Sequence, residues 1–161
     1  MDPVPTSSDP MGGALSVEIN GVVIPSFMLG SVSASVAQVI RKSDRLSGST
    51  SRPSNQLDNP VFDIVFYPNS WKDLQYFMPD NIEGDSFVLG GSSCTIPDDV
   101  PVVFHYECED DDNRDVSMPL ASVSFEDKGE RNANDDLAVT IHIYPQTNPL
   151  GQVVYGPMPT S

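Results

Sequence analysis

The sequence predicts a mainly β protein: an antiparallel β-sandwich or barrel of about six or seven strands, with one short flanking helix and a long loop between early strands. Three observations predict it. Apolar and polar residues alternate in several short segments, as strands with one buried face require. Gly- and Pro-containing connections separate them, and short connections favour antiparallel neighbours. Only one short segment has helical spacing. With 161 residues, the chain is long enough for one domain with a sizeable core.

The first element is a β-hairpin. Residues 15–19 alternate apolar and polar, Asn20 and Gly21 follow, and Val22 resumes an apolar run. Asn-Gly supplies the two positive φ angles of a type I′ turn, which predicts a β-hairpin here. Residues 31–40 alternate again with small side chains and predict one long second strand. A helix is the weaker alternative there, because Ser and Val are poor interior helix residues.

Residues 41–59 are expected to form an extended basic loop, because Ser, Thr, Gly and Pro dominate the segment. A loop of this length inside a compact domain is usually functional or disordered. Residues 61–67 then predict a strand between two prolines. Asn69 or Ser70 is the expected cap of a short helix that ends at Pro79. Its apolar side chains share one face and are expected to pack on a sheet; they are Trp71, Leu74, Phe77 and Met78.

Three further strands are predicted at 100–106, 117–126 and 137–144. The domain is therefore expected to span residues 13–144. Residues 1–12 hold three prolines and no periodicity, and we expect a flexible N-terminal arm there. Residues 145–161 hold four prolines and form a Pro-rich C-terminal extension, which we expect to wrap over a neighbour or to trail free.

The charge distribution is uneven. The formal net charge is -15, with 23 acidic residues against eight Lys and Arg. Such acidity favours solubility and argues against holding nucleic acid by phosphate neutralisation. Half of the basic residues fall in the expected loop: Arg41, Lys42, Arg45 and Arg52. An acidic body with one basic segment has the charge layout of a protein that binds copies of itself.

No catalytic set, cofactor site or metal framework is predicted. The acidic run 107–115 puts Asp115 where an EF-hand calcium loop requires Gly, which excludes that motif and leaves a solvated loop or a looser cation site. His105 and His142 lie alone within strands, where packed or half-exposed histidines are common. Cys94 and Cys108 are free thiols or one disulfide, and the carboxylates around Cys108 disfavour a thiolate. The chain is therefore expected not to be an enzyme.

No targeting or membrane segment is predicted either. The first residues lack the basic and apolar regions of a signal peptide. No apolar run approaches the length of about 20 residues that a membrane span needs. We therefore expect a protein made in the cytoplasm, with no membrane partner.

The order of elements resembles the major tail (tail tube) proteins of long-tailed bacteriophages, over about residues 13–155. The likeness rests on the Asn20–Gly21 hairpin, a long strand and loop, and a strand running into a helix that ends at Met78–Pro79. The Met118–Pro119–Leu120 segment and the closing strand with its Tyr-Pro exit complete the pattern. The resemblance implies a virion tail location and hexameric rings stacked into a tube that carries the genome.

The resemblance also implies partners and sites. In that family the long early loop reaches an adjacent ring, so contacts between subunits or rings are expected at Arg41, Lys42, Arg45 and Arg52. Partners would be further copies of the chain, other phage tail proteins, and viral DNA that passes without specific binding. A carboxylate-lined lumen would repel phosphates. The candidates are the strand-borne Glu18, Asp63 and Glu126, which could equally be ordinary solvent-facing residues.

Two other functions stay open. The chain could be another virion component, such as a head-decoration or tail-ring protein. It could also be a monomeric β-sandwich that binds a ligand such as carbohydrate. That function needs an exposed aromatic platform, and the aromatic residues lie mostly within apolar patterns.

Overall fold

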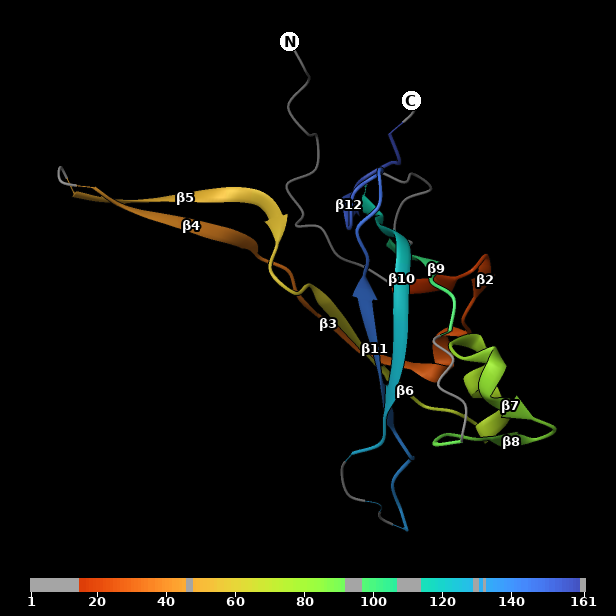
Figure 1. The fold of residues 1–161 in the computed structure, drawn as a ribbon. Coiled ribbons are helices and arrows are strands. Elements are labelled where there is room, and N and C mark those ends of the chain that lie inside the picture. Colours follow the sequence, from red (N-terminus) through yellow and green to blue (C-terminus); the bar gives the residue numbers. More distant parts are fainter. Residues whose placement is uncertain are drawn as a thin grey trace, which may run out of the picture.

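The computed structural model describes residues 15–45, 48–91, 97–106, 114–128, 131 and 133–159; of residues 43–45 and 49 it describes only the backbone. Within these ranges the chain forms strands and three short 3₁₀ helices (Figure 1). The strands are β1 (Leu15–Ile19), β2 (Val22–Val23), β3 (Leu29–Ser35), β4 (Gln38–Arg45), β5 (Gly48–Leu57), β6 (Val61–Phe66), β7 (Ile82–Glu83), β8 (Ser86–Phe87), β9 (Val100–Tyr106), β10 (Val116–Glu126), β11 (Val139–Pro145) and β12 (Val154–Tyr155). The helices are η1 (Ser26–Met28), η2 (Trp71–Tyr76) and η3 (Pro79–Asn81).

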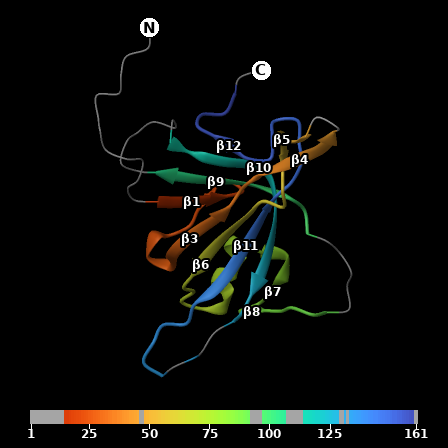
Figure 2. The ribbon, with the colours of Figure 1, turned by 90° about the vertical axis from the view of Figure 1, so that its left-hand side faces the viewer.

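One antiparallel sheet forms the body of the protein. Its strand order is β2-β1-β9-β10-β11-β6-β3, and β12 pairs with β10 as an eighth strand. The first half of β10 pairs with β9 and the second half with β11, with a register shift between Met118 and Ala121. The sheet turns at this shift, so that β1 and β9 cross the direction of β6 and β11 (Figure 2). The predicted mainly β, antiparallel fold is confirmed.

The core lies inside this curled sheet. Alternate residues of β6 and β11 are buried, because successive side chains of a strand point to opposite faces. The rings of Phe62 on β6 and Phe104 on β9 lie 5.3 Å apart, although two strands separate β6 from β9 in the sheet. The two halves of the sheet therefore face each other across one apolar core, as in a sandwich.

The expected hairpin at Asn20–Gly21 is confirmed. Both residues have positive φ, 52° and 83°, and Ile19 pairs with Val22 across a two-residue loop. β1 in turn pairs with β9 along its whole length. The local turn chemistry thus places Glu18 on the sheet with a defined register.

The short helical segment covers one end of the core as a 3₁₀ turn. The Asp73 carboxylate accepts hydrogen bonds of 2.9 Å from the backbone N–H groups of Asn69 and Ser70, which fixes its start. Leu74 and Phe77 are buried, and the Phe77 ring meets Phe66 edge-on at 4.9 Å. Trp71 was expected on the same face but is 40% exposed. A 3₁₀ turn has three residues per turn rather than 3.6, so the face drawn from α-helical spacing does not hold.

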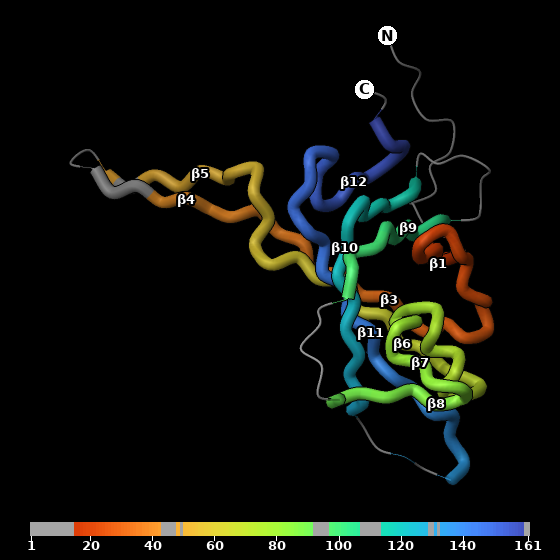
Figure 3. Tube along the Cα trace, turned by 45° about the vertical axis from the view of Figure 1, so that its right-hand side comes forward, coloured from red at the N-terminus to blue at the C-terminus, as the bar shows by residue number. Residues whose placement is uncertain are grey.

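The segment expected as a long second strand and a loop differs from that prediction. Pairing of β3 with β6 ends at Ser35, and residues 38–45 pair instead with residues 48–57. The basic segment is therefore a two-stranded ribbon that projects from the sheet (Figures 1 and 3). The inward backbone groups of a ribbon pair across it and the outward ones face water, so Ser- and Thr-rich strands can form it without a core. We call the ribbon formed by β4 and β5 the arm.

The C-terminal extension, where the structure describes it, packs on the body of its own chain. Val154 and Tyr155 form β12 beside β10, and the backbone N–H of Gly156 donates to the carbonyl oxygen of Asp115 at 2.7 Å. The expectation that this segment wraps over a neighbour or trails free is therefore wrong over residues 154–156. Residues 1–14, including the predicted N-terminal arm, lie outside the described residues.

Candidate assembly arm and histidine–carboxylate clusters

The arm carries its basic residues in a defined arrangement. Arg41 pairs directly with Arg52, and Lys42 pairs with Ser51. Directly opposite residues of an antiparallel pair point to the same side, so the two arginines share one face of the ribbon. Ile40 pairs with Pro53 on the other face, where Ile40 is 52% exposed. Arg45 pairs with Gly48 at the far end of the arm, and its side chain lies outside the described atoms.

Arg41, Lys42 and Arg52 have no ionic partner among the residues that the structure describes. All three are exposed, and no carboxylate of a described residue lies within ion-pair distance of them. Like charges placed directly opposite each other destabilise a strand pair. An isolated two-stranded ribbon is also only marginally stable in water. The arm therefore has the properties of a segment that gains stability from an anionic partner.

The three acidic candidates lie on the sheet surface that points away from the core. Glu18 lies between the buried Val17 and Ile19, Asp63 lies between the buried Phe62 and Ile64, and Glu126 follows the partly buried Phe125. They are not isolated carboxylates. Each lies at hydrogen-bond distance from a ring nitrogen of a histidine on the adjacent strand. Two clusters result, and together they contain both histidines of the chain.

The first cluster joins β1, β9 and the residue before β10. His105 Nε2 lies 2.9 Å from Glu18 Oε2, and its Nδ1 lies 2.9 Å from Asp115 Oδ2. The backbone register explains the contacts, because Ser16 pairs with His105 and Glu18 is two residues further along the same face. Asp115 is only 9% exposed.

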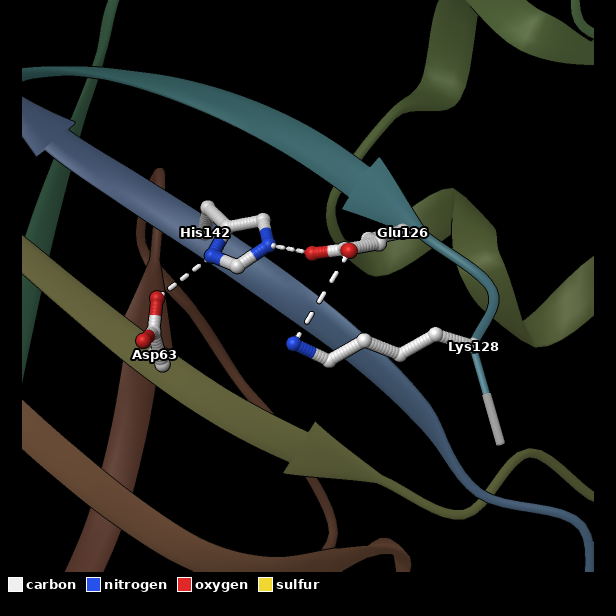
Figure 4. A network of polar contacts seen from close by, with 4 residues as sticks. All are labelled: Asp63, Glu126, Lys128 and His142. Atoms are coloured by element: carbon white, nitrogen blue, oxygen red, sulfur yellow. Dashed lines mark hydrogen bonds and ion pairs between the residues drawn. The ribbon is translucent and has the colours of Figure 1, made fainter. Parts of the chain in front are cut away.

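The second cluster joins β6, β11 and β10 (Figure 4). His142 Nδ1 lies 2.5 Å from Asp63 Oδ1, and its Nε2 lies 2.5 Å from Glu126 Oε2. In the backbone register His142 on β11 is directly opposite Asp63 on β6. On its other side it is opposite Ser124 on β10, and Glu126 is two residues further along that strand. Lys128 adds a longer ion pair of 3.8 Å to Glu126.

Both clusters favour the imidazolium form. Neutral imidazole has one N–H, whereas here both ring nitrogens face carboxylate oxygens, so two donated hydrogen bonds require the protonated ring. Burial lowers the pKa of His105, but the hydrogen bond to Glu18 and the charge of Asp115 together raise it above the ordinary value. Burial likewise lowers the pKa of His142, and the hydrogen bonds to Asp63 and Glu126 raise it overall. Each protonated histidine thus links three strands or strand ends.

Sequence reasoning missed these clusters. The sequence predicts two separate histidines, packed or half-exposed, and places Asp115 in a solvated acidic loop. The structure instead buries Asp115 and pairs it with His105. Two of the four contacts join residues 79 and 87 positions apart, and the other two join residues 10 and 16 apart across neighbouring strands, so no regular local spacing reveals them. The alternation that placed Glu18, Asp63 and Glu126 on the outer face was the one available signal.

Chemistry of other kinds has little support in the described part of the chain. No group of three or more His, Cys, Asp or Glu residues is arranged there to hold a metal ion. In the two clusters both ring nitrogens already face carboxylates, which leaves neither free as a ligand. No described helix is long and apolar enough to cross a membrane. Cys94, Cys108 and residues 107–113 lie outside the described residues, so the expectations for the thiols and for most of the acidic run stay untested.

Comparison with known proteins supports the fold. No protein-family model and no curated protein matches the sequence. Among solved structures, a chain of the anti-feeding prophage cap, the tube terminating cap, covers 89% of this chain and 91% of its own, with 11% identity and a TM-score of 0.58. A chain of the sheath–tube complex of an extracellular contractile injection system matches with 12% identity, 94% and 90% coverage and a TM-score of 0.54.

A third structure, the sheath/tube terminator of that system, covers 96% of both chains with 13% identity and a TM-score of 0.50. All three matches extend over nearly the whole chain, so the likeness concerns the complete domain rather than one motif. At these identities it concerns the fold alone. The chain therefore has the fold found in proteins of phage-tail-like contractile particles.

Proposed function

We propose that this protein is a structural, non-enzymatic subunit of a phage-tail-like tube, which assembles with copies of itself into rings, hexameric by the family resemblance, that stack into a tube. The observation that carries the proposal is the arm: a basic, self-paired ribbon projects from an acidic body whose fold recurs in tail proteins. Subunits with a charge of -15 repel one another, and cationic segments that meet acidic surfaces offset this repulsion and fix the register. Other tail proteins are the expected neighbours.

The outer face of the sheet is proposed to line the lumen. Glu18, Asp63 and Glu126 would then face the channel, and a surplus of carboxylates would let DNA, or another anionic cargo, pass without sticking. The pairing of each carboxylate with a histidine refines this picture, because the imidazolium charge reduces the negative potential of the wall. The location would be the tail of a virion or related particle.

A second candidate is a terminating ring at the end of such a tube. It is favoured because the matched structures include a tube terminating cap and a sheath/tube terminator. The two functions differ in growth: a tube subunit offers complementary surfaces on both ends and polymerises, whereas a terminator forms one ring that does not extend itself.

Sedimentation and negative-stain microscopy of the purified protein test both candidates. Long tubes are expected for the tube subunit, and single rings for a terminator. A species that stays monomeric at high concentration, over a range of salt, would overturn both. Replacing Arg41, Lys42, Arg45 and Arg52 with Ser should abolish stacking and leave the circular dichroism spectrum unchanged. Unimpaired tubes from that variant would remove the proposed role of the arm.

A further inference from the structure

A groove of about 590 Å³ lies at one end of the sheet. Phe27 in η1, Leu29 at the start of β3 and Tyr67 directly after β6 line it. Asp135 and Asp136, from the loop before β11, line it as well. Phe27 is 70% exposed although it is a large apolar residue. The groove therefore presents an exposed aromatic ring beside carboxylates, within a lining that is mainly polar.

The exposed side chains of the arm are chemically complementary to those of the groove. One face of the ribbon offers an exposed apolar side chain, Ile40, beside the cationic Lys42, and the opposite face offers Arg41 and Arg52. Contacts of this type, with a buried apolar centre and charges around it, are typical of specific protein interfaces. No described carboxylate of its own chain lies within ion-pair distance of these three cations, which leaves them accessible to an anionic partner.

An arm cannot reach the groove of its own chain. β3 and β6 form a paired unit with the groove at the end marked by Leu29 and Phe66, and the arm at the end marked by Ser35 and Val61. At about 3.3 Å per residue these ends lie about 20 Å apart. The arm also projects away from the sheet rather than along it (Figure 3).

We propose that this groove receives the arm of a second copy of the chain, with Ile40 against Phe27 and the neighbouring Lys42, on the same face of the ribbon, against Asp136. The inference rests on the proposed function and names the acceptor surface that it needs. Because arm and groove are different surfaces at opposite ends of the same strands, the contact is head-to-tail. Such contacts do not saturate in a dimer but continue from copy to copy or from ring to ring.

A groove variant, Phe27→Ala with Asp136→Lys, tests the proposal. Both side chains are exposed, so the fold should survive. The matched control is Leu150→Ala with Asp98→Lys, which makes the same kinds of change at exposed positions outside the groove. The groove variant should lose at least about ten-fold in the protein fraction that sediments as tubes, and the control should assemble like the wild type.

Mixing separates this proposal from the proposed function. The groove variant keeps its arm, and the Arg41→Ser, Lys42→Ser, Arg52→Ser variant keeps its groove. A one-to-one mixture should form complexes joined by a single arm–groove contact and stop there: two stacked rings, or a heterodimer if single chains do not form rings. A heterodimer without any wild-type rings would support the docking and refute the proposed function. The docking would be overturned if the groove variant formed tubes as well as the wild type does. It would also be overturned if the two variants did not associate when mixed.

Discussion

The stability of this protein should fall as the pH rises through the pKa values of His105 and His142. A group whose folded-state pKa is raised contributes its full stabilisation below the unfolded pKa, about 6.5 for histidine. That contribution is lost as the pH rises through the folded pKa. Since hydrogen bonds to carboxylates raise the pKa of both histidines, the decline should occur above pH 6.5.

The magnitude follows from the number of hydrogen bonds. Each imidazolium donates two hydrogen bonds to carboxylates. Deprotonation removes one of these hydrogen bonds and leaves a nitrogen lone pair facing a carboxylate oxygen. A hydrogen bond to a charged group contributes about 1.5–3 kcal/mol. The His105 side chain is 34% exposed and Glu126 43%, so solvent screening reduces this to about 1 kcal/mol per cluster. The two clusters together should therefore contribute about 2 kcal/mol, or about 4–8 °C in Tm.

Denaturant unfolding between pH 6 and 9, followed by circular dichroism, measures this loss. The His105→Gln, His142→Gln double variant is the control, because glutamine occupies a similar place without titrating. It should lack the decline that the wild type has. Assembly must be prevented during the measurement, for which the arm variant serves as the background. A flat wild-type profile, or an equal decline in the double variant, would refute the reasoning.

Three further predictions concern the turn, the core and assembly. Gly21→Ala should cost about 1 kcal/mol in unfolding free energy, because Gly21 has a φ of 83° that alanine rarely adopts; an unchanged denaturation midpoint would contradict this. Phe66→Ala should cost about 3–5 kcal/mol, since its ring is fully buried; a loss below 1 kcal/mol would mean that the core relaxes around the cavity. Raising salt from 0.1 to 1 M should weaken tube formation, measured by sedimentation, because salt screens the arm charges; salt-independent tubes would argue for a mainly apolar contact.

Local patterns predicted much of the fold. The Asn20–Gly21 turn, the strands around Phe62, Phe104 and Ile141, and the antiparallel class all follow from short-range alternation and turn residues, which act within a few positions. The break between β3 and β4 did not, because Val36 continues the alternation and neither Ala37 nor Gln38 is a turn signal. Only the pairing of β4 with β5, which starts at Gln38, separates the two strands.

The sites were predictable only in part. The cationic set of the arm is visible in the sequence because its residues are close together. The clusters depend on the register of β6 with β11 and of β1 with β9, which long-range packing decides. The groove depends on three chain segments, around Phe27, Tyr67 and Asp135, that meet only in the folded sheet. Sequence alternation could place Asp63 on the outer face, yet it could not name His142 as its partner.

The two histidines also determine how much negative charge the outer face of the sheet carries. Each cluster contains two carboxylates, so it bears a net charge of about minus one with the imidazolium and minus two without it. If this face lines a channel, the same deprotonation that weakens the strand links makes the wall more repulsive to phosphates. Stability and passage would then depend on pH in opposite directions, with tighter strand links at lower pH and a more repulsive wall at higher pH. Histidine, unlike lysine, lets both effects change near neutral pH, because the ordinary pKa of histidine lies close to neutral pH.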